Sequence, residues 1–304
     1  MKYIIFFLCA MSAVKAGQFD IKLLQSIEEP DLFVEKVLSA FELKENDSYE
    51  DNIFMRTMPK ALSGKDDDFK NGALASIIEK ADKVSGKERH AVIALIQAGA
   101  NPNLLCKRER YDSELTCPLY QVSYSQDKAY AQALLLRKAD VNIKTFGKLP
   151  VIWTAHTVEL AKFLVEKGAS ATGRKSHGLT LLHQVMEHEN YEPSLLRYYV
   201  SRGLDIHDQD NVSQATPLHD ICSWPSEFNG IHQEKLKILL ELGADTTTLT
   251  NNWGVTVLQK IENNIGLQDD EELRAHYQNL KDIILEHFYK EEAKRLRNIC
   301  IDGI

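Results

Sequence analysis

A short turn recurs along the chain, and each copy follows an apolar segment with helical character. The five copies are QAGANPN (97–103), RKADVN (137–142), EKGASA (166–171), SRGLDI (201–206) and ELGADT (241–246). After each turn a polar stretch leads to a new apolar start. The last five starts, at positions 118, 150, 181, 217 and 257, lie 32, 31, 36 and 40 residues apart. A period of this size indicates an array of small helical units rather than one large core.

The residues at the starts and turns suit helix ends. Thr216 can cap the orphan N–H groups of a helix, and Pro217 fits the first helical turn because its missing N–H costs nothing there. Leu218 and Ile221 share a face and are expected to be buried. The turns place Gly where a helix ends in a left-handed residue, except that Lys138 takes this place in one copy, which predicts a strained end. The glycines concerned are Gly99, Gly168, Gly203 and Gly243.

These motifs resemble those of ankyrin-repeat proteins. TPLHDI (216–221) and TLLHQV (180–185) are close to the T-P-L-H-x-A pattern that opens the first helix of that repeat. ELGADT matches the turn that ends the second helix, and a weaker early copy runs from GALASII (72–78) to QAGANPN. The resemblance covers roughly residues 69–288. It implies an all-α solenoid of helix-turn-helix repeats with short hairpin connections, in which each unit buries its apolar face against its neighbours.

This interpretation divides the chain into four parts. Residues 1–16 are predicted to be a signal peptide, 17–68 an N-terminal helical cap and acidic connector, 69–265 the repeats, and 266–304 C-terminal capping helices. The approximate repeat bounds are 69–103, 112–142, 144–172, 175–207, 211–246 and 251–288. Residues 19–43 are expected to be helical, 45–70 a polar loop, and 269–298 one long helix or two. The inserts 105–115, 187–193 and 225–231 are expected to lengthen turns between elements.

The first sixteen residues, MKYIIFFLCAMSAVKA, combine one Lys, an apolar run and a small-residue cleavage pattern. This is the pattern of a secretory signal peptide cut after Ala16, and the run is too short to span a bilayer comfortably. The alternative is an uncleaved anchor or a buried helix. The expected location is secreted or periplasmic, with no membrane span after cleavage. The formal net charge of −8 argues against a general nucleic-acid binder.

Four cysteines follow the predicted cleavage site, and an oxidising compartment permits disulfides between them. Cys106 and Cys117 flank a polar loop and can pair; the alternative is two unpaired, partly buried thiols. The spacing is too irregular and too sparse for a fold built on disulfides.

His219 and Cys222 are spaced like a fragment of a metal site. Zinc sites need a second ligand pair, which the sequence lacks, and no motif of a hydrolase or nucleotide-binding enzyme is present. His183 stands at the place equivalent to His219 one unit earlier, and a repeated residue favours a structural role. The ankyrin resemblance implies that these histidines hydrogen-bond backbone groups between neighbouring loops. We therefore expect no catalytic residue, no metal and no cofactor.

The resemblance places a binding surface on a concave face, formed by the ends of the first helices and by the hairpin tips. Seven such positions carry aromatic or His side chains, which are common interface anchors. They are Tyr124, His156, His188 and Trp224 at helix ends, and Phe146, His177 and Trp253 at hairpin tips. For Trp224 and Trp253 the alternative is packing onto the neighbouring repeat.

The expected function is non-enzymatic binding of a partner protein by a monomer. The acidic balance favours a partner with a basic patch. The alternatives are an enzyme or regulatory subunit with a site built from the loop inserts, and a structural component of a larger assembly.

Overall fold

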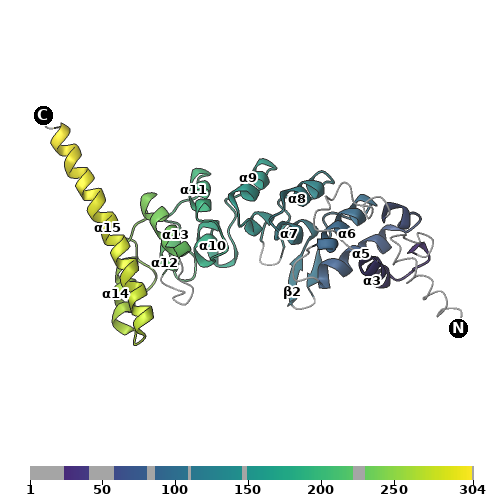
Figure 1. Cartoon of the computed structure of the whole chain (residues 1–304), viewed down its shortest axis with the longest axis horizontal. Coiled ribbons are helices and arrows are strands. Elements are labelled where there is room, and N and C mark those ends of the chain that lie inside the picture. The colour runs from purple at the N-terminus through teal and green to yellow at the C-terminus, as the bar shows by residue number, and fades with distance from the viewer. Residues whose placement is uncertain are drawn as a thin grey trace. The chain divides into compact units, whose positions relative to one another are not determined.

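The computed structural model describes residues 24–40, 58–80, 86–108, 111–145, 149–221 and 230–302, and these residues are mostly helical (Figure 1). The expected all-α class agrees with this content, with one small sheet added. The predicted signal peptide, residues 1–16, lies outside the described residues. The chain divides into two compact units. The first comprises the described part of 1–155 with 166–169, and the second comprises the described part of 156–165 and 170–304.

The described part of the first unit consists of α-helices, a 3-10 helix and a two-stranded sheet. The bounds are α3 Pro30–Ala40, α5 Asp67–Lys80, α6 Gly86–Gln97, β1 Cys106–Arg108, β2 Tyr111–Thr116, α7 Pro118–Ser123, α8 Lys128–Leu135 and η2 Val151–Thr154. Helix α5 packs against α3 and α6, and α8 packs against α6 and α7. Because α6 has neighbours on two sides, its residues 91–96 are all buried, and the helix is apolar nearly all round.

The predicted polar loop at 45–70 is partly wrong. Residues 45–57 lie outside the described residues, but 58–61 are helical and α5 begins at Asp67. Met58, Ala61 and Leu62 are buried, so this segment belongs to the core. The sequence does not reveal these apolar positions, because the segment is rich in charged residues and one helical turn is too short to show a 3.6-residue period.

The insert at 105–115, predicted to be an extended turn, forms part of an antiparallel hairpin. Cys106 pairs with Thr116 and Lys107 with Leu115, and the register shifts before Arg108 pairs with Tyr111. Strand β1 packs against α5. A strand of three residues is too short to show the alternation by which strands are predicted.

Cys106 and Cys117 are free thiols, which decides between the two alternatives for this pair. Both are buried, and burial raises the pKa of each thiol to about 12. Cys117 has a structural role as the N-cap of α7, where its Sγ accepts the Tyr120 N–H at 3.4 Å. Cys117 precedes Pro118 as Thr216 precedes Pro217, so the two residues occupy equivalent positions in the recurring motif.

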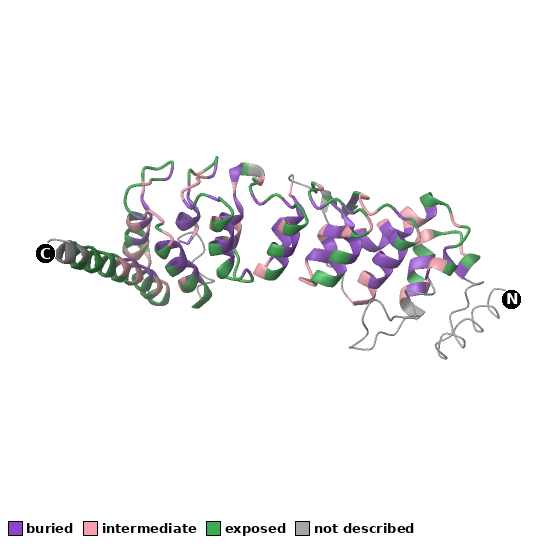
Figure 2. Ribbon diagram, turned by 90° about the horizontal axis from the view of Figure 1, so that it is seen from above, coloured by how far each residue is buried: buried purple, intermediate pink, exposed green. Residues whose placement is uncertain are grey.

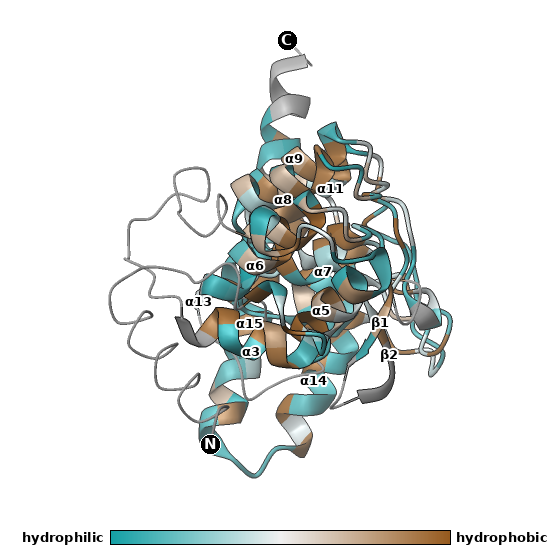
Figure 3. Cartoon of the chain, turned by 90° about the vertical axis from the view of Figure 1, so that its right-hand side faces the viewer, coloured by the Kyte–Doolittle hydropathy of each residue, from teal (hydrophilic) through white to brown (hydrophobic). Residues whose placement is uncertain are grey.

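The second unit arranges its helices in two layers. The bounds are α9 Val158–Glu166, η3 Ser176–Gly178, α10 Leu181–Glu187, α11 Ser194–Ser201, α12 Pro217–Asp220, α13 Gly230–Glu241, α14 Val257–Leu267 and α15 Glu271–Asp302. Helix α12 lies between α10 and α14, and α13 lies between α11 and α15. Buried residues lie within this unit and exposed ones along its outer faces (Figure 2), and the described helices carry their hydrophobic residues in bands (Figure 3).

Three helices of this unit start with the same capping arrangement. Thr180, Thr216 and Thr256 are N-caps, and the residue three positions on, His183, His219 or Gln259, accepts the cap backbone N–H. In both histidines Nδ1 is this acceptor, at 3.1 Å. Nε2 therefore carries the proton. It donates to Ala215 O at 3.1 Å from His183 and to Val255 O at 3.3 Å from His219. The predicted structural role of these histidines is confirmed.

The helix ends also follow the prediction. The four glycines have φ values between +90° and +109°, and Lys138 takes the same left-handed conformation at φ +66°. After Gly99, Lys138, Gly203 and Gly243, the next residue donates its N–H to the carbonyl five positions back, which closes the last turn. A residue with a Cβ is strained in this conformation, so the helix end at Lys138 carries more backbone strain than the ends at the four glycines.

The two buried histidines make stability depend on pH. Burial lowers the pKa of His183 and of His219 below the ordinary value of 6.5. Below pH 6.5 the unfolded chain binds protons that the folded chain does not, so these residues stabilise the fold above this pH and the contribution declines as the pH falls.

We predict that the double variant His183→Gln, His219→Gln keeps the caps, as Gln259 does in α14, but loses both bonds to the next loop. At pH 7.5 this should cost about 1–3 kcal/mol in urea unfolding. The deficit relative to the unmodified chain should shrink at pH 5.5, because only the unmodified chain has the two histidines to protonate. A deficit independent of pH would contradict the assignment.

Candidate partner-binding surface

The seven residues predicted at the binding face fall into three groups. Tyr124, His156 and His188 each follow the end of a helix, His177 and Trp253 lie on hairpin tips, and Phe146 and Trp224 lie outside the described residues. Tyr124 is the C-cap of α7 in the first unit. It is half-buried, and its ring meets that of Tyr120 edge-on at 5.4 Å. The remaining described residues belong to the second unit.

His156 and His188 both lie close to Tyr191, a buried residue that the sequence did not single out. The ring centroid of Tyr191 lies 4.3 Å from that of His156 and 6.0 Å from that of His188. The loop around Tyr191 is bound to the segment before α9, because the Glu192 N–H donates to His156 O at 2.8 Å and the Asn190 Nδ2 lies 3.1 Å from His156 Nδ1. His188 is the more exposed of the two histidines. The structure thus brings two predicted residues together around one ring.

A buried lysine lies beneath this cluster. Lys235 of α13 is fully buried, and its Nζ donates to the carbonyl of His188 at 2.5 Å. Burial lowers the pKa of Lys235 to about 8. Nearby in the chain, Asp220 ends α12, and burial together with the charge of Glu187 raises its pKa well above the ordinary value. Neither residue was predicted, because nothing in a linear pattern marks which charged side chain will be enclosed.

Both predicted residues on hairpin tips, His177 and Trp253, are exposed. The loops at 175–179, 210–215 and 251–255 are each closed by a backbone hydrogen bond: Lys175 N to Leu179 O, Asp210 N to Ala215 O, and Asn251 N to Val255 O. Each has an exposed side chain near its centre. We call His177, Val212 and Trp253 the tip row. Val212 is 61% and Trp253 is 69% exposed.

Hydrogen bonds between neighbouring hairpins hold the tip row in place. The Asn211 N–H donates to His177 O at 2.7 Å, and the Asn252 N–H donates to Ser213 O at 2.8 Å. The Asn252 Nδ2 also donates to Val212 O at 3.0 Å. Because these bonds involve the backbone of each tip, the three side chains start from backbone positions at a set spacing, and little backbone freedom is left to lose on binding.

The exposure of Trp253 argues against the packing role that was the alternative for this residue. A ring packed on a neighbouring repeat would be largely buried, whereas this one is 69% exposed. Its backbone is well fixed, because Asn251 Oδ1 accepts the N–H groups of Trp253 and Val255 at 3.0 and 3.1 Å. The indole is therefore held out toward solvent by an ordered loop. Trp224, the other tryptophan with this ambiguity, is outside the described residues.

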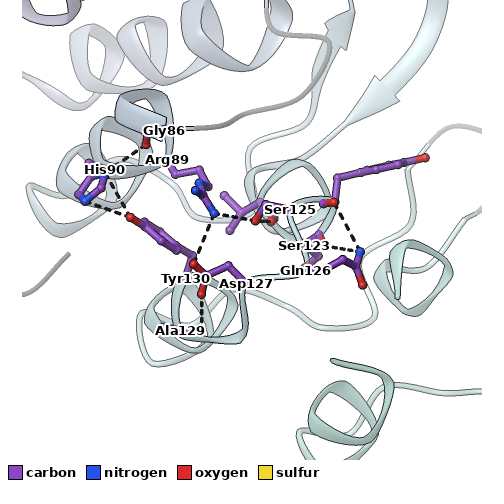
Figure 4. Close-up of polar contacts among 11 residues, drawn as sticks. Gly86, Arg89, His90, Ser123, Ser125, Gln126, Asp127, Ala129 and Tyr130 are labelled. Atoms are coloured by element: carbon purple, nitrogen blue, oxygen red, sulfur yellow. Dashed lines mark hydrogen bonds and ion pairs between the residues drawn. The ribbon is translucent and has the colours of Figure 1, made fainter. Parts of the chain in front are cut away.

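A second polar cluster, in the first unit, was not predicted (Figure 4). The His90 Nδ1 lies 3.1 Å from Gly86 O, and the Tyr130 hydroxyl lies 3.0 Å from His90 Nε2. The Arg89 guanidinium lies 4.5 Å from the Tyr130 ring centroid and pairs with Asp127 at 3.4 Å. Burial raises the pKa of Tyr130, which keeps the phenol neutral. These contacts join α6 to α8, so their role is structural.

Two further features concern metal ions and membranes in the described part of the chain. There, no group of three or more His, Cys, Asp or Glu side chains is arranged to hold a metal ion. None of the helices described combines the length and the apolar content needed to cross a bilayer. The Cys222 of the suspected His-Cys pair lies outside the described residues.

Comparison with known proteins does not assign the chain to a family. No family model matches the sequence, and no curated protein is detectably similar to it.

The contact between adjacent tips can be tested at Gly178. A Cβ at this position would lie 2.6 Å from the Asn211 Cγ, and the backbone has φ +79°. At Gly243, φ is +90° but a Cβ would have no atom within 4 Å. We predict that both Gly→Ala variants lose about 1 kcal/mol from backbone strain, and that Gly178→Ala loses roughly 1–2 kcal/mol more by crowding the next hairpin.

Urea unfolding measures both losses, and the added substitution Asn211→Ala should bring the Gly178→Ala variant back toward Gly243→Ala. Equal losses in the two single variants would show that the tips do not touch.

Proposed function

We propose that this protein is a non-enzymatic protein-binding module, built from ankyrin-like repeats, that contacts its partner through the tip row. The observation that carries the proposal is the exposed indole of Trp253 on a hydrogen-bonded hairpin. An ordered Trp anchor loses little conformational freedom on binding, and Trp is among the residues most often found at interface hot spots.

Three features of the second unit support the ankyrin-like architecture. Its helices alternate between two layers along the chain. Each of the starts at Thr180 and Thr216 places a His in a cap and directs its Nε2 to the loop that follows. Successive loops close as short hairpins with exposed tips. These are the features that the resemblance to ankyrin repeats implies.

The proposed partner contact extends from the tip row. Val212 and Trp253 provide an apolar centre and His177 a polar end, so the partner segment is expected to present an apolar side chain to Trp253. We further propose that the protein is exported across a membrane and acts as a secreted or periplasmic protein. This rests on the signal-peptide pattern of residues 1–16.

Partner binding can be tested with Trp253→Ala and a matched control, Leu267→Ala. Leu267 is 79% exposed at the end of α14 and lies outside the tip row. A partner is first captured on the immobilised unmodified chain and identified by mass spectrometry, and its Kd is then measured calorimetrically for each variant. We expect Trp253→Ala to raise the Kd by about thirtyfold, as for an interface hot spot, and Leu267→Ala to leave it unchanged.

The melting temperature of both variants should remain close to that of the unmodified chain, because neither side chain is buried. A large loss of stability in Trp253→Ala with the Kd unchanged would instead assign the indole to packing.

A further inference from the structure

The carbonyl of Val255 accepts two hydrogen bonds in the hairpin that carries Trp253. The Asn251 N–H donates to it at 3.1 Å, which closes the hairpin, and His219 Nε2 donates to it at 3.3 Å. His219 belongs to the preceding helix α12, and its side chain is fully buried. A buried imidazole outside the hairpin therefore binds the carbonyl at which the hairpin closes.

This arrangement requires a neutral imidazole. The single ring proton of His219 is on Nε2, because Nδ1 accepts the Thr216 N–H at 3.1 Å. In an imidazolium both ring nitrogens are donors, so a proton on Nδ1 would point at the Thr216 N–H. The ring is rigid, and turning Nδ1 away from the helix cap also withdraws Nε2 from Val255 O. Protonation of His219 and closure of the hairpin therefore exclude each other.

The charged groups that act on His219 come from α14 and from two loops, and they are Lys260, Asp210 and Asp245. Burial has the largest effect and lowers the pKa of His219. The Lys260 ammonium acts in the same direction, whereas the bond to Val255 O and the two carboxylates act against it. Within α12, burial and the charge of Glu187 of α10 raise the pKa of Asp220, which favours the uncharged form of that carboxyl. The closed hairpin therefore favours the neutral imidazole.

The neighbouring hairpin at 210–215 is held more firmly than the one at 251–255. In the first, the Asp210 carboxylate accepts three backbone N–H groups of the loop, at distances between 2.6 and 3.0 Å. In the second, the neutral Oδ1 of Asn251 accepts two. Hydrogen bonds to an ionised acceptor are roughly twice as strong as those between neutral groups. Loss of an imidazole bond should therefore loosen the hairpin of Trp253 more than its neighbour.

We propose that His219 is an acid-sensitive switch for the tip row: when it takes up a second proton, the hairpin at 251–255 opens and Trp253 loses its fixed position. The proposal rests on the proposed function, because the tip row is the surface that it regulates. The closed form excludes the proton, and the open form accepts it with the ordinary pKa of 6.5. By linkage, the ratio of open to closed hairpin should rise about tenfold from pH 7.5 to pH 5.5.

Amide hydrogen exchange measures this opening on the full chain without a partner. After correction for the intrinsic effect of pH, the Asn251 N–H should lose about tenfold of its protection between pH 7.5 and pH 5.5. His219→Gln should abolish this loss, because Gln can cap α12 as Gln259 caps α14 but does not titrate. The matched control His183→Gln removes the other buried imidazole and should leave the loss at Asn251 unchanged.

The hairpin at 175–179 is an internal reference. It closes with a bond from Lys175 N to Leu179 O, and it follows the start at 150, which has Ile152 where the next two starts have histidine. The protection of the Lys175 N–H should therefore not depend on pH. A loss at Asn251 that persists in His219→Gln overturns the proposal. Protection at Asn251 equal to that of the α13 amides at both pH values also overturns it, because the hairpin would then open only when the whole unit unfolds.

Binding tests the consequence for the tip row. The exchange data give the closed fraction of the hairpin at each pH, and the Kd of the captured partner should rise in inverse proportion to that fraction. The same measurement on His219→Gln corrects for titration of the partner itself. A Kd that does not follow the closed fraction overturns the regulation. If Trp253→Ala leaves the Kd unchanged, the proposed function fails, whereas the exchange experiment still decides whether His219 controls the hairpin.

Discussion

The interaction on which the second unit depends is the hydrogen bond from a buried imidazole to the backbone of the next loop. His183 and His219 each accept from their own helix cap through Nδ1 and donate to the following loop through Nε2. One neutral side chain thus satisfies a polar group in its own helix cap and another in the next loop, both of which would otherwise be buried without partners. Burial makes these bonds strong and also makes protonation costly, which is why the same residues that order the loops make them sensitive to acid.

The position of the exposed tips follows from this coupling. Once one loop is bound to the next, the hairpins align, and further backbone bonds from Asn211 and Asn252 set the distance from tip to tip. The side chains at 177, 212 and 253 then need no packing partners of their own. Stability in this unit lies in the caps and helices, whereas the recognition that we propose lies in exposed side chains at the tips.

The first and last helices that the structure describes are held by apolar side chains. Helix α3 packs Phe33 edge-on against Phe69, with ring centroids 5.5 Å apart. Helix α15 buries Tyr277, Leu280 and Ile284 and then runs on beyond its support. The polar residues of its second half keep it compatible with water.

Much of this could be predicted from residues whose role is local. Thr216, Pro217 and Gly243 act within one helical turn of their own position, so their sequence context alone indicates caps and ends, and the period of the motifs indicates the order of the helices. Tertiary structure decided what depends on distant neighbours: the burial of Met58 and Lys235, the β1–β2 hairpin, the Arg89–Tyr130 cluster, and the exposure of Trp253. These depend on which segments meet in space, and a linear pattern does not carry that information because burial is set by the packing of the whole unit.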